Sequence, residues 1–381
     1  MLINELPDDC LLAIFDYIQD LEDLINCFKV CDKWCNLIVG RTKKIKYLID
    51  QPSYSHDYFC FHLKELINVT CLSRLFPNLR IAESYHPPYG DQTPIEDFAK
   101  LIRDSESLKG IIHGSCYVLD FELMSEYANL EMLSTGSIRP NLSKINENVK
   151  QLHLTTTTLD ILQQIAHYFP NLEKLHTFTI IHGSARDSDE QVLPNLKILE
   201  LEDCAGCCHS FLFMDSCPAL QSAHITIGRT HITINDSIKN LNLRDLVIHS
   251  YEPIEWNVIS RCISKCPNLK HLAIRGTYLK DEHIQQLILI LPKLTLLDVR
   301  KSRGVTQEAA DHVRDYCKQY GRSIKFYFKK DDKQIESDWP QLLNRPDKVC
   351  LGFDFMEHCF FKNFNDLPHF LDPVDDLKCK R

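Results

Sequence analysis

This chain of 381 residues has few glycines, no excess of basic residues and no long uninterrupted apolar run. With only 12 glycines, a glycine-rich loop that cradles phosphates is not expected. The formal net charge of −9 argues against a nucleic-acid-binding surface, which depends on concentrated lysine and arginine. The most apolar run, 284–297, is interrupted by Pro292 and Lys293 and is too short to span a bilayer. We therefore expect neither nucleic acid nor a membrane among its partners.

The 17 cysteines do not form a disulfide framework, because their number is odd and their spacing is irregular. The N-terminus lacks the charged, apolar and small-residue regions of a secretory signal. These features predict reduced thiols and a location in the cytoplasm, the nucleus or both. A composition of 44% hydrophobic and 25% charged residues suits two or three soluble domains or one elongated array.

Residues 6–38 predict three short helices with more apolar surface than so small a unit can bury. Two stripes recur at helical spacing, one of Leu11, Ile14, Phe15 and Ile18 and one of Leu21, Leu24, Ile25 and Phe28. Pro7 suits the first turn of the first helix, and Asp20 can cap the second. The spare apolar residues indicate an interface with a partner.

The segments Leu6-Pro7, Leu11-Leu12-x-Ile14-Phe15, Leu24 and Val30-Cys31-Asp32-Lys33-Trp34 resemble the F-box over its full length. The resemblance implies docking on a Skp-type adaptor, which links the chain to a cullin scaffold and a RING subunit in an SCF ubiquitin ligase. It assigns the adaptor-facing side chains to Leu6, Pro7, Leu11, Leu12, Ile14, Phe15, Leu24, Val30 and Trp34. The alternative is an ordinary helical cap for the part of the chain that follows.

Beyond about residue 70 one phrase recurs, as in FPNLEKL at 169, LPNLKILEL at 193 and CPNLKHLAI at 266. Its hydrophobic anchors are separated by 19 to 26 residues and are Leu108, Leu130, Val149, Leu172, Leu196, Leu220, Leu243, Leu269 and Leu294. Weaker units at Leu79 and Ile324 extend the array. The L-x-x-L-x-L pattern at the anchors predicts a short strand, and apolar residues three and four apart before each anchor predict a helix.

This period resembles the cysteine-containing leucine-rich repeats that often follow an F-box. The predicted fold class is α/β, with an N-terminal three-helix F-box and a horseshoe-shaped solenoid of parallel concave strands and convex helices. The predicted domains are 1–45 for the F-box, 46–75 for a linker or first irregular repeat, 76–328 for the solenoid and 329–381 for a C-terminal cap or tail.

Alternation along each strand places one column of residues on the concave face. That column contains His153, His176, Glu200, His224, Val247, Ala273 and Asp298, and adjacent columns add Lys174, Asp245, His249, His271, Arg275 and Arg300. Neighbouring strands lie about 4.8 Å apart, so these side chains form a nearly continuous polar strip. The strip is interpreted either as a docking site for a target protein or as a solvated sheet face without a role.

Cys204-x-x-Cys207-Cys208-His209 is the strongest candidate for chemistry, because thiolates and imidazole bind zinc or form a nucleophile with its base. We interpret these thiols as structural, because Cys204 falls in the turn position of a repeat and no second CxxC is present. We therefore expect no metal and no cofactor.

The C-terminal stretch from Lys329 begins with mixed charges and ends with an aromatic cluster of Phe353, Phe355, Phe360, Phe361, Phe364 and Phe370. The favoured interpretation is a cap over the exposed core of the last repeat, which solenoids require. In the alternative the tail folds back against the concave face.

Together these patterns predict a non-catalytic substrate receptor that binds an adaptor at one end and an unidentified protein target on the concave face. Two alternatives stay open. One is a leucine-rich-repeat scaffold that delivers no substrate for ubiquitination, and the other is an enzyme that uses Cys207 or Cys208 with His209.

Overall fold

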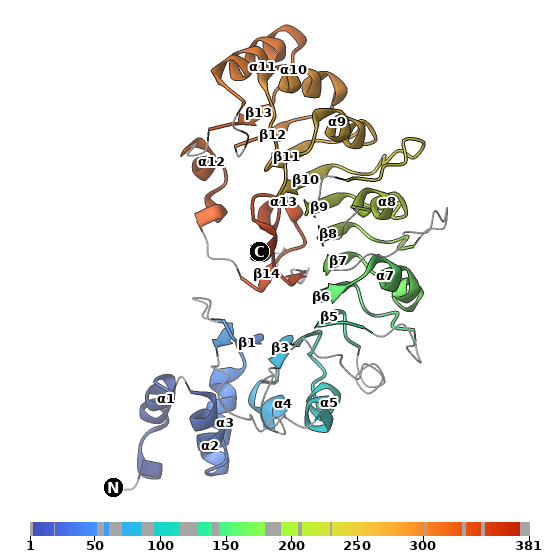
Figure 1. Ribbon diagram of the computed structural model, residues 1–381. Coiled ribbons are helices and arrows are strands. Elements are labelled where there is room, and N and C mark those ends of the chain that lie inside the picture. The colour runs from blue at the N-terminus through green and yellow to red at the C-terminus, as the bar shows by residue number, and fades with distance from the viewer. Residues whose placement is uncertain are drawn as a thin grey trace. The chain divides into compact units, whose positions relative to one another are not determined.

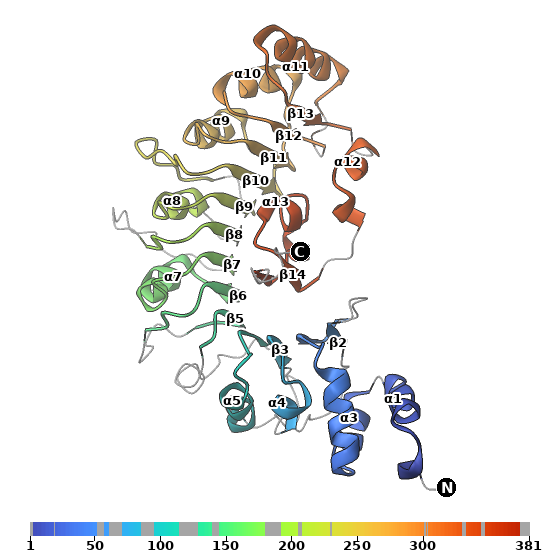
Figure 2. The same cartoon turned by 180° about the vertical axis from the view of Figure 1, so that it is seen from behind.

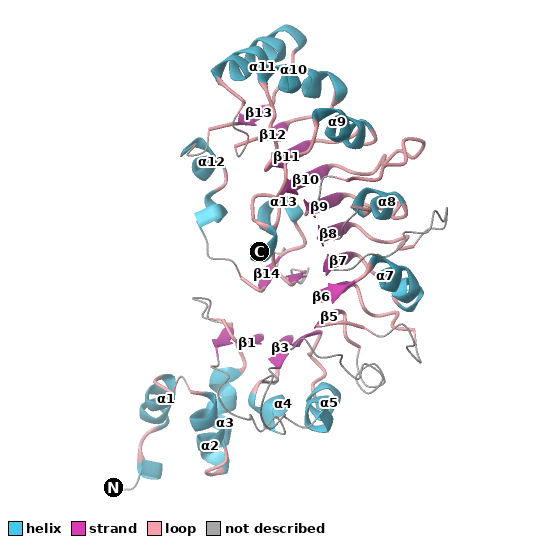
Figure 3. Ribbon diagram, viewed as in Figure 1, coloured by secondary structure: helices cyan, strands magenta, loops and turns pink. Residues whose placement is uncertain are grey.

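The computed structural model describes residues 3–18, 20–51, 57–60, 71–84, 95–113, 129–138, 145–179, 192–204, 208–228, 231–300, 302, 304–329, 333–343 and 347–373. They fall into two compact units, of which unit 1 holds the described residues up to Ile138 and unit 2 those from Ile145 onward. The chain is α/β, because N-terminal helices are followed by parallel strands that alternate with helices (Figure 1 and Figure 3). Within the described residues no helix combines the length and the hydrophobicity needed to cross a membrane.

Unit 1 begins with three helices that confirm the prediction for residues 6–38. After the 3₁₀ turn η1 (Ile3–Glu5), they are α1 (Asp8–Asp16), α2 (Leu21–Phe28) and α3 (Asp32–Thr42). Pro7 immediately precedes α1, as expected of a residue that lacks a donor. Asp20 Oδ1 accepts a hydrogen bond from the backbone N–H of Asp23 at 2.9 Å, which confirms the predicted cap of α2. Both α1 and α2 pack against α3.

The three helices share one apolar core with the rest of unit 1. Leu11, Leu24 and Ile38 are fully buried in a cluster that continues through Leu48 and Leu75. The strands of this unit are parallel in the order β5-β4-β3-β1-β2. The remaining elements of unit 1 are β1 (Tyr47–Ile49), β2 (Tyr58–Cys60), α4 (Leu72–Leu75), β3 (Ile81–Ser84), α5 (Ile95–Asp104), β4 (Gly110–His113) and β5 (Met132–Thr135).

Unit 2 contains parallel strands in sequential order from β6 to β13, with helices along one side of the sheet (Figure 1). The first elements are β6 (Gln151–Thr157), α7 (Leu159–Ile165), η3 (Ala166–Tyr168), β7 (Lys174–Thr179), β8 (Ile198–Asp203), α8 (Ser210–Asp215) and β9 (Ser222–Ile227). They are followed by β10 (Asp245–Ser250), α9 (Trp256–Ser264), β11 (His271–Arg275), α10 (Asp281–Ile290), β12 (Leu296–Asp298), α11 (Gln307–Tyr320) and β13 (Lys325–Tyr327). This is the arrangement expected of a leucine-rich-repeat solenoid.

The repeat pattern explains the core of unit 2. In the clearest repeats the three positions of L-x-x-L-x-L are at most 1% exposed, as at Leu243, Leu246 and Ile248. The strand begins two residues after each anchor, which confirms the prediction, and the weaker anchors Leu79 and Ile324 also precede strands. Each repeat thus buries its apolar side chains between the sheet and the helices.

An asparagine directly before the leucine anchor, which in three of four cases belongs to the recurring Pro-Asn-Leu phrase, links successive repeats. Its side-chain Nδ2–H donates to a backbone carbonyl 24 to 27 residues earlier, at 2.7 to 2.9 Å. The four pairs in unit 2 are Asn171 with Glu147, Asn195 with Pro170, Asn242 with Pro218, and Asn268 with Leu241. The phrase therefore recurs because its asparagine satisfies a carbonyl at the same place in the neighbouring repeat.

Residues 347–373, here called the C-terminal segment, lie against the sheet on the face opposite the helices (Figure 2). After α12 (Lys333–Asp338) and η4 (Pro340–Leu343), the elements of this segment are β14 (Val349–Leu351), α13 (Phe355–His358), η5 (Phe364–Asp366) and β15 (Phe370–Asp372). Phe360 and Phe364 share a buried cluster with Ile198, Val247 and Ala273 of the strands. The favoured interpretation of a cap over the last repeat is thus corrected, and the alternative of a tail folded against the strands holds.

Truncation of a core leucine tests this fold. We expect Leu272→Ala to lower the free energy of unfolding by about 2–5 kcal/mol, because Leu272 is fully buried. Leu289→Ala is the matched control, because Leu289 is 66% exposed on α10 and its loss leaves no cavity. Urea unfolding followed by circular dichroism measures both, and equal effects would contradict the repeat register.

Candidate functional site

The residues predicted to face an adaptor divide into a buried and an exposed set. Leu11, Phe15, Leu24 and Trp34 are at most 8% exposed and lie in the core of unit 1. The Phe15 and Trp34 rings pack edge to face with centroids 5.1 Å apart. These four side chains therefore support the surface of the helices and do not form it, which corrects their predicted placement.

The exposed set consists of Pro7, Ile14 and Val30, with Leu6 and Leu12 partly exposed. Ile14 is 42% and Val30 54% exposed, and Tyr17, which the sequence prediction did not include, is 87% exposed. Exposed large apolar side chains within so short a stretch are what the predicted docking surface requires. The docking role of these residues stays a prediction.

Two cations of α3 hold α1 at its two ends. Lys33 Nζ lies 3.0 Å from Asp8 Oδ1, and Arg41 Nε lies 2.9 Å from Asp16 Oδ1. Arg41 also donates to the backbone carbonyl of Phe15 near the C-terminus of α1. The exposed apolar side chains of α1 are thus presented by a helix with a fixed position on α3.

In unit 2 the predicted polar strip exists, but its central residues are covered. The register pairs His153 with His176, His176 with Glu200, and Glu200 with His224, which confirms that these side chains share one row. We call the side chains of this face the polar strand face; they are Gln151, His153, Lys174, His176, Glu200, His224, Asp245, His271, Arg275 and Asp298. All except His271 are at most 9% exposed, so the expectation of an accessible strip is wrong for most of them.

A buried ion pair forms the centre of the polar strand face. Lys174 Nζ lies 2.6 Å from Glu200 Oε2, and both side chains are at most 1% exposed. His176 Nδ1 lies 2.9 Å from the same oxygen. A carboxylate only accepts, so Nδ1 of the imidazole is the donor. Burial raises the pKa of Glu200, but Lys174 and His176 outweigh burial and lower that pKa overall, so the carboxylate is ionised.

The C-terminal segment completes the hydrogen bonding of this centre. Lys174 Nζ donates to the backbone carbonyl of Pro368 at 3.2 Å. Gln151 holds both backbone groups of Leu371, because its Nε2 donates to the carbonyl at 2.7 Å and its Oε1 accepts from the N–H at 2.9 Å. These bonds join residues 194 to 220 positions apart in the chain.

Further along the sheet the same pattern continues. Arg275 donates to the backbone carbonyls of Lys362 at 2.6 Å and Phe360 at 2.8 Å. His224 Nε2 lies 3.2 Å from the carbonyl oxygen of Lys362, and because a carbonyl only accepts, the Nε2–H of His224 donates this hydrogen bond. The C-terminal segment is thus bound mainly through its backbone carbonyls.

Aromatic rings make further contacts between the C-terminal segment and the polar strand face. His369 stacks on His153 with centroids 3.9 Å apart, and Phe364 stacks on His176 at 4.6 Å. Phe364 also meets His224 edge to face at 6.0 Å. Such contacts require correctly placed rings and therefore specify which part of the segment lies at each strand.

The covered histidines are held neutral. Burial and the neighbouring Arg275 lower the pKa of His224 to about 3, and burial together with His176 lowers the pKa of His369 to about 3. Burial and His369 lower the pKa of His153 well below its ordinary range. The covered histidines of the polar strand face therefore do not change their charge near pH 6–7.

The other predicted residues of the strip form two smaller groups. His271 Nδ1 lies 2.6 Å from Asp245 Oδ1. Arg300 binds both oxygens of Asp298 at 2.8 and 2.9 Å. Partly exposed residues, namely His249, His271 and Arg300, are the predicted target-binding side chains that remain accessible.

The sequence prediction missed Gln151, Phe364 and His369 as members of this site. Gln151 pairs with Lys174 in the register, so the column that predicted Lys174 could have predicted it. Nothing in the pattern of the C-terminal aromatic residues indicated which strand each of them meets.

The described part of the cysteine cluster does not gather into a reactive site. Cys208 is buried, and its Sγ lies 3.5 Å from Ser210 Oγ. Burial and Asp203 raise the pKa of Cys208 to about 12, which disfavours the thiolate needed for attack or metal binding. Cys204 Sγ lies 3.8 Å from Glu202 Oε1, and Cys207 is outside the described residues. In the described part of the chain no group of three or more histidine, cysteine or acidic residues is placed to hold a metal.

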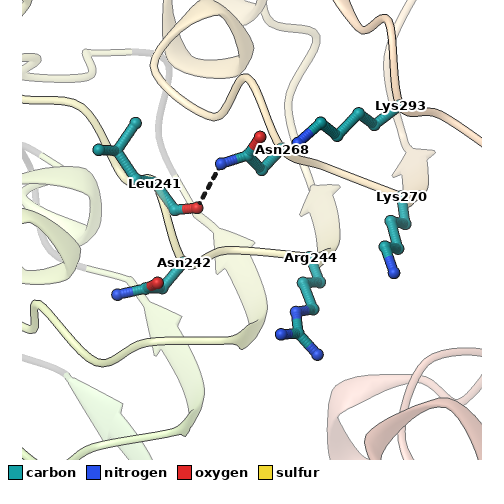
Figure 4. A pocket seen from close by; sticks show the side chains of 6 residues that line it. All are labelled: Leu241, Asn242, Arg244, Asn268, Lys270 and Lys293. Carbon is teal, nitrogen blue, oxygen red and sulfur yellow. Dashed lines mark hydrogen bonds between the residues drawn. The ribbon is translucent and has the colours of Figure 1, made fainter.

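A basic pocket lies beside the starts of β10, β11 and β12 (Figure 4). It is lined by Leu241, Asn242, Arg244, Asn268, Lys270 and Lys293. Arg244 and Lys270 precede neighbouring strands, and both side chains are exposed. Lys197, which holds the same repeat position before β8, is paired with Glu173 at 3.1 Å. The pocket brings together Arg244, Lys270 and Lys293 and so concentrates positive charge on a chain that is acidic overall.

Comparison with known proteins identifies the N-terminal region. A family model described as F-box-like matches residues 3–42, which span the three helices of unit 1. No curated protein matches the chain.

Several solved structures share weak similarity with the chain. A Bacteroides fragilis protein is 16% identical with a TM-score of 0.31, over 66% of this chain and 65% of that one. The TLR13–ssRNA13 complex is 13% identical with a TM-score of 0.36, over 67% of this chain and 36% of that one. The Rad7 and Elc1 complex in yeast is 13% identical with a TM-score of 0.26, over 86% of this chain and 94% of that one. The chain thus spans less than two thirds of the first two, and these TM-scores support no statement about function.

Loss of the buried carboxylate tests the centre of the polar strand face. We expect Glu200→Gln to lower the free energy of unfolding by about 3–5 kcal/mol, because it leaves the Lys174 charge buried and uncompensated. Asp236→Asn is the matched control, because the Asp236–Arg261 pair is exposed and solvent screens it. Urea unfolding measures the free energy of unfolding of both variants. A loss in Glu200→Gln as small as that in the control would contradict the buried ion pair.

Mild acid tests the neutral histidines. The unfolded chain takes up protons on histidine near pH 6.5, whereas His224 stays neutral in the fold until about pH 3. The unfolded state then binds more protons, so stability is full above about pH 6.5 and is lost as the pH falls towards 3. From pH 7.5 to 5.5 we expect His224 alone to cost roughly 1 kcal/mol.

The check is the difference in unfolding free energy between these two pH values. It should be smaller in His224→Gln than in wild type, and unchanged in His312→Gln, because His312 is exposed on α11. An equal difference in wild type and His224→Gln would contradict a neutral buried imidazole.

Proposed function

We propose that this chain is the substrate-recognition subunit of an SCF-type ubiquitin ligase. Its F-box-like domain, residues 3–42, docks on a Skp-type adaptor and through it joins a cullin and a RING subunit. Unit 2 binds a target protein. The chain itself is non-catalytic and acts in the cytoplasm or nucleus, and its contribution to ubiquitin transfer is proximity and orientation.

One observation supports the adaptor-binding part of the proposal most strongly. The residues that match the F-box-like family also carry exposed large apolar side chains, at Ile14, Tyr17 and Val30. Burial of such side chains on a partner contributes about 1.5–3 kcal/mol each. The buried Phe15 and Trp34 keep the helices that present them in place.

For target binding we assign the strand side of unit 2. Its accessible polar side chains are His249, His271 and Arg300, and the covered residues of the polar strand face become available only if the C-terminal segment moves. The basic pocket adds exposed cations that favour an acidic partner. The chemistry of ubiquitin transfer needs no nucleophile from this chain.

Charge substitutions on the helices test the adaptor contact. We expect Ile14→Asp with Val30→Asp to weaken capture of a Skp-type adaptor at least tenfold, because each substitution buries an unpaired carboxylate in an apolar interface. Leu289→Asp is the matched control, because Leu289 is also an exposed apolar residue, at 66%, and lies in unit 2. Titration calorimetry with purified adaptor gives the affinities, and circular dichroism confirms the fold.

Unchanged adaptor affinity in the folded double variant would contradict the proposal. Recovery of cullin with the tagged wild-type chain, together with loss of target turnover in the double variant, separates a ligase receptor from a scaffold that delivers no substrate.

A further inference from the structure

The hydrogen bonds between the polar strand face and the C-terminal segment run almost entirely to backbone. Gln151, Lys174, His224 and Arg275 each bind a carbonyl of the C-terminal segment. Every residue of a peptide offers such a carbonyl, so these bonds would hold another segment that follows the same path. They provide affinity without demanding a particular sequence.

Sequence preference comes from the rings. Phe364 stacks on His176, and His369 stacks on His153, five residues further along the segment. Phe360 lies in the same buried cluster as Phe364, four residues before it. A segment that replaces this one must therefore place aromatic rings at comparable intervals.

The polar strand face can be uncovered at less cost than an apolar core. Lys174, Glu200 and Arg275 would regain water, which hydrates charged groups strongly. The strand side chains that share the buried cluster with the C-terminal segment are one per strand, namely Ile198, Val247, Ala273, Leu296 and Tyr327. A conventional solenoid core would instead expose leucine and isoleucine along its whole length.

We propose that the polar strand face is a peptide-binding surface and that the C-terminal segment is its exchangeable occupant. The ligand class is a linear peptide segment of a target protein, with aromatic residues spaced as Phe360 and Phe364 are, and it binds by displacing the C-terminal segment. This inference rests on the proposed role of unit 2 in target binding.

Competition between tethered and free ligand makes the inference measurable. A tethered segment acts at an effective concentration near the millimolar range, so a free peptide with identical contacts binds the wild-type chain weakly. A substitution that weakens the contacts of the C-terminal segment in the chain, but leaves the free peptide unchanged, removes this disadvantage of the free peptide. The free peptide should then bind more tightly.

The probe is a fluorescein-labelled peptide with the sequence of residues 357–373, kept reduced and followed by fluorescence anisotropy on the full chain. We expect Phe364→Ala and His369→Ala each to bind it at least tenfold more tightly than wild type, because each tethered copy has lost one stacked ring. Lys318→Gln is the matched control in unit 2, because Lys318 is exposed on α11, and it should bind the peptide as wild type does.

Near-ultraviolet circular dichroism selects the folded variants, and either one suffices for the test. Affinity equal to that of wild type, or equal binding of a scrambled peptide, would overturn the inference. Adaptor capture by the same samples is measured in parallel. If the two variants capture the adaptor but do not bind the peptide more tightly than wild type, only the inference of an exchangeable C-terminal segment is contradicted. If the wild-type chain fails to capture the adaptor, the proposed function is contradicted.

Discussion

The buried ion pair of Lys174 and Glu200 constrains the whole strand side of unit 2. Each charge by itself would be strongly destabilising so far from water, and together they still leave donor capacity on the ammonium. The carbonyl of Pro368 takes up part of that capacity. A cover that offers backbone carbonyls is therefore required wherever these charges are buried, and the C-terminal segment supplies it. The neutral state of the neighbouring histidines follows from the same burial.

Periodicity predicted the repeats because one rule is applied many times. The L-x-x-L-x-L phrase determines which side chains face the helices, as at Leu269, Leu272 and Ile274, and alternation then determines which share the opposite face. The row from His153 to His224 was predicted correctly on this ground. The F-box-like helices were predictable for a similar reason, since both their stripes and the Asp20 cap are local signals.

That the tail folds against the strands was only the less favoured of two interpretations, and which of its residues cover the row could not be predicted. The bond between Gln151 and Leu371 joins residues 220 positions apart, and no repeated phrase relates them. The C-terminal segment has no period, so its aromatic residues indicated only that some surface would bury them. On the helices the stripes mixed buried with exposed residues: Phe15 supports the fold while its neighbour Ile14 faces solvent, a distinction that depends on how α1 packs on α3.

Amide hydrogen exchange of the full chain at Leu371, compared with Ala223 in β9, tests most directly whether the C-terminal segment is an exchangeable cover. The Leu371 N–H donates to Gln151, and Ala223 lies in the interior of the sheet. The account predicts that Leu371 is protected, but through an opening of lower free energy than the one that exposes Ala223. Exchange of Leu371 at the rate of an exposed amide would contradict the cover, and protection equal to that of Ala223 would contradict its exchange.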